Sequence, residues 1–157
     1  MFRHMRLKEN QLPQEDAERI MREQPHGVLA VEGDDGYSYA VPLSYAYKDG
    51  RIYFHGATEG HKYDAAKKSS KVSFCVISKD DILPAEFNTL FESAIAFGKL
   101  RVLESDEERM EALIAILEKY SPEHMESGKK YIEGNWDEVA CFAIDVEHLT
   151  GKFGTPE

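Results

Sequence analysis

The sequence is poor in cysteine, with only Cys75 and Cys141 among its 157 residues. Each lies within an apolar run, VSFCVI or VACFAI, and neither has a further cysteine or a histidine nearby at metal-ligand spacing. Disulfide-stabilised small domains and structural zinc sites need more cysteines at closer spacing. The sequence excludes both, and we interpret the two cysteines as buried thiols.

A long hydrophobic run is also missing. No segment approaches the roughly 18 consecutive apolar residues that a membrane-spanning helix requires. The N-terminal residues MFRHMRLKEN contain no apolar core of a signal peptide. We therefore expect a soluble, cytoplasmic protein.

Basic residues are scarce relative to acidic ones. The chain has 19 lysines and arginines against 29 aspartates and glutamates, a formal net charge of −10. Nucleic acids and anionic membrane surfaces are bound by basic surfaces, so neither is an expected partner. Any anionic ligand must be held by a local group of cations.

The residues that are present have the composition of a globular protein, 42% hydrophobic and 31% charged, without repeats or low-complexity segments. A chain of this length buries roughly 70% of its unfolded surface, and we expect one domain over residues 1–157 with its core in about 10–150. Hydrophobic periodicity predicts strands and short helices. The predicted strands are 27–32, 37–47, 51–56, 71–77, 91–104 and 139–147. The predicted helices are 14–24, 60–68 and 105–120.

Local signals refine these elements. Gly98 predicts a bulge in its strand, and Ser105 with Glu108 predicts a capping box at the start of the third helix. That helix is expected to bury Met110, Leu113, Ile114 and Leu117. Residues 121–138 are expected to be irregular, and the first three strands to form an antiparallel meander. Six strands in succession, with short helices between them, favour a mainly β fold. We expect a closed or nearly closed six-stranded antiparallel split barrel with peripheral helices.

The predicted strand 37–47, YSYAVPLSYAY, has two unlike faces. Alternate positions from Tyr37 to Tyr47 are bulky, whereas the positions between them are Ser, Ala or Pro. Because side chains alternate along a strand, one face packs and the other leaves the backbone nearly bare. A flat ligand would fit against the bare face. Close approach of another segment or a subunit explains the same pattern.

The segment FHGATEGHK (54–62) joins a predicted strand to a predicted helix. A helix start offers unpaired N–H groups and a partial positive charge, which suit an anion. Gly56 and Gly60 allow close approach of the backbone, and His61 with Lys62 supplies positive charge, so we predict a phosphate site. Glu59 must then point into solvent.

Other interpretations of this segment remain open. His55 would also serve as a structural residue at a strand end, and His61 with Lys62 as an exposed first turn. A metal site formed by His55, His61 and Asp64 has suitable residue types, but the spacing is not diagnostic, and no metal is predicted. No serine or cysteine stands in the context of a hydrolytic nucleophile.

The ordered combination of VPLSYAY, RIYFHGATEGHKYD, KSSKVSFCVI and ESAIAFGKLRVL resembles the FMN-binding split-barrel superfamily. This superfamily includes pyridoxamine 5′-phosphate oxidase, and the resemblance is greatest to its nitroimidazole-resistance branch, over about residues 10–150. The resemblance implies a six-stranded barrel, FMN as cofactor, and a homodimer whose subunits both contribute to each cofactor site.

The resemblance also implies a set of cofactor contacts. The corresponding positions are Val41, Pro42, Leu43, Ser44, His55, Gly56, Ala57, His61, Lys62, Ser93 and Trp136. The first four would meet the flavin ring through their backbone, the phosphate would lie at His61 and Lys62, and Ser93 would lie near the ring. Trp136 would cover the flavin from the partner subunit or pack in the core.

By the same resemblance His55 is the candidate catalytic residue, as a proton donor or substrate contact beside the flavin. Relatives often have Arg where this chain has His61, and an imidazole offers no bidentate fork. The C-terminal GKFGTPE lacks the arginine motif with which the vitamin oxidase holds its substrate, so that activity is not expected. We expect an FMN-dependent oxidoreductase acting on a small aromatic or nitro compound, or alternatively a flavin- or haem-binding module without turnover.

Overall fold

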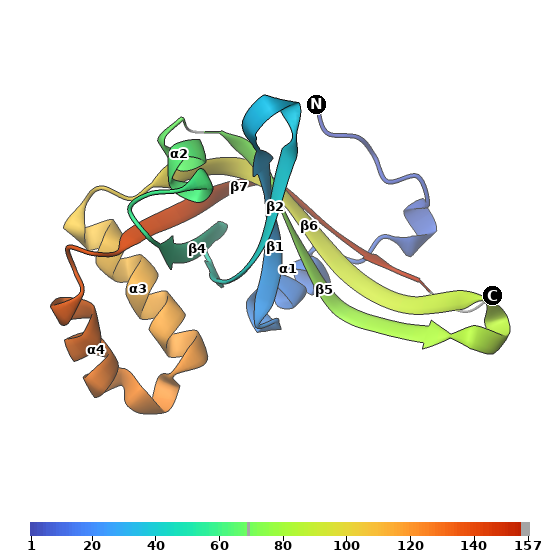
Figure 1. The fold of residues 1–157 in the computed structure, drawn as a ribbon. Coiled ribbons are helices and arrows are strands. Elements are labelled where there is room, and N and C mark those ends of the chain that lie inside the picture. Colours follow the sequence, from blue (N-terminus) through green and yellow to red (C-terminus); the bar gives the residue numbers. More distant parts are fainter. Residues whose placement is uncertain (69, 155–157) are drawn as a thin grey trace.

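The computed structural model describes residues 1–68 and 70–154 (Figure 1). The described strands are β1 (His26–Glu32), β2 (Ser38–Ser44), β3 (Ala46–Lys48), β4 (Arg51–Gly56), β5 (Lys71–Leu83), β6 (Asn88–Val102) and β7 (Ala140–Phe153). The described α-helices are α1 (Gln14–Glu23), α2 (His61–Lys67), α3 (Asp106–Tyr120) and α4 (Met125–Gly134). Among these helices, none is long and apolar enough to cross a membrane.

Within the described residues, the seven strands form a single antiparallel sheet in the order β2-β1-β5-β6-β7-β4-β3. The strands β2 and β3, which follow each other in the chain, lie at its two edges. The predicted closed, six-stranded barrel is therefore wrong in strand number and in closure: the sheet is unclosed. The mainly β architecture with peripheral helices is confirmed.

The extra strand arises because the predicted strand 37–47 breaks at Tyr45. The backbone N–H of Tyr45 donates to the hydroxyl of Tyr120 (2.9 Å), and its carbonyl accepts from the ammonium of Lys119 (2.9 Å). Side chains of α3 thus take the hydrogen bonds that a neighbouring strand would otherwise supply. As a result β2 pairs with β1, whereas β3 pairs with β4, and the predicted three-stranded meander does not form.

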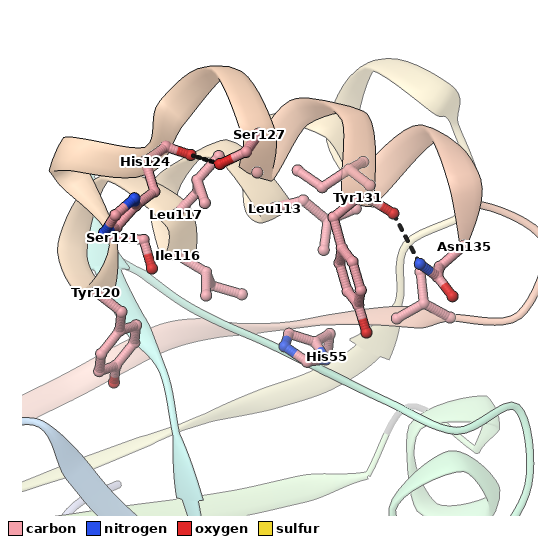
Figure 2. A pocket seen from close by; sticks show the side chains of 13 residues that line it. His55, Leu113, Ile116, Leu117, Tyr120, Ser121, His124, Ser127, Tyr131 and Asn135 are labelled. Carbon is pink, nitrogen blue, oxygen red and sulfur yellow. Dashed lines mark hydrogen bonds between the residues drawn. The ribbon is translucent and has the colours of Figure 1, made fainter.

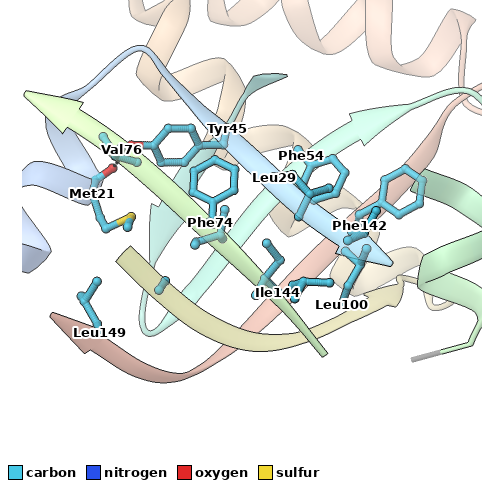
Figure 3. Close-up of a cluster of buried hydrophobic side chains, with 14 of the residues drawn as sticks. Met21, Leu29, Tyr45, Phe54, Phe74, Val76, Leu100, Phe142, Ile144 and Leu149 are labelled. Carbon is cyan, nitrogen blue, oxygen red and sulfur yellow. Dashed lines mark hydrogen bonds between the residues drawn. The ribbon is translucent and has the colours of Figure 1, made fainter. Parts of the chain in front are cut away.

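Two clusters of apolar side chains pack on the sheet, one on its inner face and one on part of its outer face. The larger cluster lies inside the curved sheet under α1, whose Ala17, Ile20 and Met21 are fully buried as the helical period predicts (Figure 3). A second cluster lies between β4, β7 and the helices α3 and α4. Cys141 belongs to the second cluster, as expected, but Cys75 is only partly buried, and its assignment as a buried thiol is wrong.

The bulge at Gly98 and the capping box at Ser105 have different outcomes. The pairing of β6 with β7 shifts register between Phe97 and Gly98, which confirms the bulge. The Ser105 hydroxyl accepts from the Glu108 N–H (3.2 Å), but the Glu108 carboxylate pairs with Arg101 (2.9 Å), so only half of the capping box forms.

Two predictions for the helices are wrong. Met110 is 37% exposed, because α3 turns its alanines and Leu113 toward the sheet. Helix α4 lies within the segment that was expected to be irregular, and it buries Ile132 against the second cluster. In Figure 1, α3 and α4 lie together at the end of the sheet opposite the long β5–β6 hairpin.

Candidate functional site

Strand β2 has the two faces that its sequence predicts. Tyr39, Val41 and Leu43 are half-buried and pack against the larger core cluster, while Pro42 and Ser44 are exposed together with the other small residues of the strand. The exposed side is nearly bare backbone over several residues. It has the flatness that a ring system or a second protein surface needs.

This exposed face continues across the sheet. The register places Pro42 beside Val28, Val28 beside Cys75, and Cys75 beside Ile95. Val28 and Ile95 are each 39% exposed, and Ile77 of β5 is 58% exposed. The β2 face is therefore one edge of a larger apolar surface on the outside of the sheet, which we call the outer apolar face.

Helix α2 packs against β6 and β1, and the side chains of its first two residues point to different sides. The His61 Nε2 lies 3.1 Å from a carboxylate oxygen of Asp34, and the imidazole stacks on the ring of Tyr39 at 4.5 Å. His61 therefore faces the turn that joins β1 to β2. An anion bound there would compete with Asp34 for the imidazole.

Lys62 points to the other side, toward β4 and β7. Its Nζ is 3.6 Å from the position that a Cβ on Gly56 would occupy, and the ring of Phe142 is equally close to that position. Lys62 forms no ion pair with any residue that the structure describes. Its ammonium is therefore available to an anion beside the paired ends of β4 and β7.

The backbone before α2 is also shaped for close approach. Gly60 has φ +108°, a conformation that residues with a side chain rarely adopt, and a Cβ there would meet no atom within 4 Å. Glu59 is exposed, as the phosphate prediction requires. The Lys62 ammonium, the open space at Gly60 and the backbone of Gly56 and Ala57 together fit a phosphate group.

His55 lies at the end of β4 with its side chain on the opposite face from Phe54. Phe54 is in the core inside the sheet, so His55 faces the α3–α4 layer, where it lines a cavity (Figure 2). Partial burial, and then the nearby Lys62 ammonium, lower the pKa of His55 below its usual 6.5. The imidazole is therefore neutral at neutral pH and can either donate or accept a hydrogen bond.

The remaining predicted contacts lie elsewhere. Ser93 of β6 pairs with Lys152 of β7, ten residues along β7 from Phe142 beside Lys62. At a strand rise of about 3.3 Å per residue, Ser93 lies roughly 30 Å from Lys62. Ser93 is therefore remote from the phosphate position, and its predicted place near the flavin ring stays a prediction.

Trp136 packs against the second core cluster, with the guanidinium of Arg109 4.1 Å from its ring centroid. Arg109 also donates to the Trp136 carbonyl (2.6 Å). Trp136 and Thr58 line the same small hollow beside the loop before α2.

The grouping of His55, His61 and Asp64 considered for a metal is not assembled. Among residues 1–68 and 70–154, no cluster of three or more His, Cys, Asp or Glu side chains is arranged to hold a metal ion. His55 and His61 face different layers of the structure, as described above.

Sequence reasoning predicted α3 but missed α4, the second helix of the layer beside His55. Tyr120, Tyr131 and His124 approach β4 from α3, α4 and the turn between them. Met125, Gly128 and Ile132, at the helical spacing i, i+3 and i+7, were the available signal, but the two glycines of α4 obscured its helical pattern.

Solved structures of several proteins share this fold. A candidate 5-nitroimidazole antibiotic resistance protein from Bacteroides thetaiotaomicron VPI-5482 has a TM-score of 0.78 and 21% identity, over 91% of this chain and 86% of that one. The FAD and haem binding protein from Mycobacterium smegmatis has a TM-score of 0.78 and 18% identity, over 94% and 76%. The flavocytochrome Anf3 from Azotobacter vinelandii has a TM-score of 0.78 and 19% identity, over 97% and 72%. At these identities the likeness establishes the fold alone.

The sequence matches the family model of pyridoxamine 5′-phosphate oxidase over residues 13–153. The chain belongs to this flavin-binding family, and the resemblance noted from its motifs is confirmed. No curated protein matches the sequence.

Proposed function

We propose that the protein is a cytoplasmic homodimeric flavoprotein that binds FMN non-covalently and reduces a small aromatic or nitro compound. The observation that carries this proposal is the Lys62 ammonium beside Gly56, without an ion pair to any described residue, in a chain of the flavin-binding family. The cofactor supplies the electron transfer, and the protein supplies position and electrostatics. The cysteines, both free, suit a reducing compartment.

We propose FMN as the cofactor instead of FAD, because the phosphate position at Lys62 and the start of α2 suits a terminal phosphate. Lys62 offers a point charge to a phosphate dianion, and the backbone at Gly60 has open space around it. The His61 imidazole already contacts the carboxylate of Asp34, so it is less available to the phosphate than the Lys62 ammonium. The flavin ring would lie along the bare backbone of β2 around Val41, in line with the family resemblance.

His55 is the candidate proton donor or acceptor for the reaction. Its imidazole is neutral at neutral pH and lines a cavity, so it can hydrogen-bond to an organic substrate without adding charge. Catalysis of this kind is efficient when the pKa lies close to the working pH.

The outer apolar face supports the proposed homodimer. Val28, Ile77 and Ile95 expose apolar side chains side by side, and monomeric proteins rarely leave such a contiguous surface uncovered. Ser93 lies beside Ile77 on this face, and β2 forms its edge. If a second copy packs on the face, Ser93 of one protomer would lie near β2 of the other. Ser93, which is remote from Lys62 in its own protomer, would then contribute to the site of the other.

The absorption spectrum of the purified protein tests the proposal. Flavin bands, with FMN identified by mass after denaturation, are expected. The His61→Ala, Lys62→Ala double variant should keep its fold and lose most of its FMN. Anaerobic mixing with a reduced nicotinamide should bleach the flavin band, and re-oxidation by a nitroaromatic compound should restore it. A colourless protein whose melting temperature FMN does not raise would contradict the proposal.

A flavin- or haem-binding module without turnover is the second candidate. Two structures of the same fold are described as an FAD and haem binding protein and as a flavocytochrome. His55 and His124 also line one cavity of this chain. A Soret band in the same spectrum, or a flavin that no nicotinamide reduces, would favour this function.

A further inference from the structure

A cavity of about 460 Å³ lies between α3, α4 and the end of β4 (Figure 2). Ligand pockets in proteins commonly have volumes of about 300–1,000 Å³. The apolar part of its lining comes from both helices and from the segment before β7. These apolar residues are Leu113, Ile116, Leu117, Ile132 and Val139.

The lining of this α3–α4 cavity is free of permanent charge. None of its 13 residues is Asp, Glu, Lys or Arg, although such residues make up 31% of the chain. Placing a charged ligand among apolar side chains without a charged partner is unfavourable. The cavity therefore selects an uncharged molecule, in contrast to the phosphate position at Lys62.

Two hydrogen-bonding groups face this apolar space from opposite walls. The Tyr131 side chain extends from α4 toward β4, where His55 lies, as Figure 2 shows. Within residues 1–68 and 70–154, neither the Tyr131 hydroxyl nor the His55 imidazole forms a hydrogen bond. Both are available to a polar group on a bound molecule.

We propose that the α3–α4 cavity binds an uncharged aromatic molecule of two or three fused rings that carries a hydroxyl, carbonyl or nitro group. The rings pack among Leu113, Ile116 and Leu117, and the polar group reaches His55 and Tyr131. A dry cavity of roughly 150 Å³ already binds benzene, so the larger volume here suits fused rings.

This inference deepens the proposed function, and rests on it only for the role of the molecule as the electron acceptor. The cavity and the phosphate position share strand β4: His55 faces the cavity, and the next residue, Gly56, lies beside Lys62. The two sites therefore lie on opposite faces of the same strand end, one residue apart along the backbone.

The test compares 2-naphthol with its anionic analogue 2-naphthoate by calorimetric titration at pH 7, with and without saturating FMN. We expect 2-naphthol to bind once per chain and 2-naphthoate at least tenfold more weakly. Tyr131→Ala should weaken 2-naphthol binding about threefold to tenfold through the loss of an aromatic contact and a hydrogen bond. Tyr37→Ala is the matched control, because Tyr37 is 78% exposed and Tyr131 is 74% exposed, but Tyr37 does not line the cavity.

A double variant that fills the cavity gives a second measurement. Ile116→Trp with Ser127→Trp should abolish binding, whereas Glu118→Trp with Glu126→Trp, on the same helices outside the lining, should not. Circular dichroism confirms that both variants are folded.

The outcomes separate this inference from the proposed function. Saturable binding that the cavity variants weaken supports the cavity even if the protein binds no FMN. Absence of saturable binding, equal affinity for the two naphthalenes, or affinity unchanged in the cavity variants would overturn it. Displacement of 2-naphthol by FMN would also overturn it, because the probe would then occupy the flavin position.

Discussion

Replacing Lys62 with alanine should weaken FMN binding far more than replacing any other cation of α2. The Lys62 Nζ lies near Gly56 and forms no ion pair with a described residue, so its charge is available to a phosphate. A hydrogen bond to a charged group contributes about 1.5–3 kcal/mol, which corresponds to roughly a 10- to 150-fold change in the dissociation constant. The loss should shrink as ionic strength rises, because salt screens the exposed pair.

The assay is a titration of flavin fluorescence with wild-type protein and Lys62→Ala, using both FMN and riboflavin. Riboflavin lacks the phosphate, so the variant should bind it as wild-type protein does. Lys67→Ala is the matched control: Lys67 is on the last turn of the same helix, with its ammonium 5.5 Å from the ring centroid of Tyr63. His61→Ala should cost less than Lys62→Ala, because Asp34 already compensates the charge of His61.

Two results would refute this reasoning. FMN affinity that is unchanged in Lys62→Ala would remove the ammonium from the phosphate site. An equal loss for FMN and riboflavin would show that Lys62 supports the ring site or the fold instead of the phosphate. Melting curves without ligand distinguish these last two cases, since a damaged fold lowers the melting temperature of the free protein.

Three further predictions concern stability, each measured by chemical denaturation. Lys119→Met should lower the free energy of unfolding by about 2–4 kcal/mol, because two backbone carbonyls lose a charged donor. Burial lowers the pKa of Lys119 to about 8 from 10.5, so the unfolded state binds more protons between these values, and the pH dependence of stability from pH 8 to 10.5 should be more positive in wild-type protein than in the variant. The folded-state pKa of His55 lies below 6.5, so stability should fall as pH decreases through 6.5, and His55→Gln should reduce that slope; an identical slope would contradict the assignment. Gly128→Ala should destabilise by about 1–3 kcal/mol, because its Cβ would lie 2.3 Å from a Leu117 methyl group, whereas Gly134→Ala, with open space around it, should be neutral or slightly stabilising.

Much of the fold could be predicted because the relevant signals are local. The helical spacing of Ala17, Ile20 and Met21 identifies α1 and the face that it buries. The alternation along β2 identifies its exposed face, and Gly98 marks a bulge at the point where the backbone of β7 leaves no space for a Cβ. In each case the residues that carry the signal are the residues that form the structure.

The candidate site was predicted in its parts and not in its arrangement. The residues of the segment 54–62 were identified correctly as a junction with a helix start, and the carboxylate of Glu59 is exposed as required. The sequence could not show that the Asp34 carboxylate would contact the imidazole of His61. Nor could it show that His55 would face α3 and α4 while Gly56 faces Lys62 on the other side of β4. These depend on segments that are distant along the chain.

The sequence by itself determined the buried face of α1, the two faces of β2, the positions of most strands and helices, and a family with a flavin-binding fold. Only the tertiary structure decided that the second strand breaks at Tyr45, that the sheet stays open, and that α3 and α4 line a cavity over His55. The physical reason is the range of the interactions. Burial follows from the local alternation of apolar and polar side chains, whereas the break at Tyr45 depends on a hydrogen bond to Tyr120, 75 residues further along the chain.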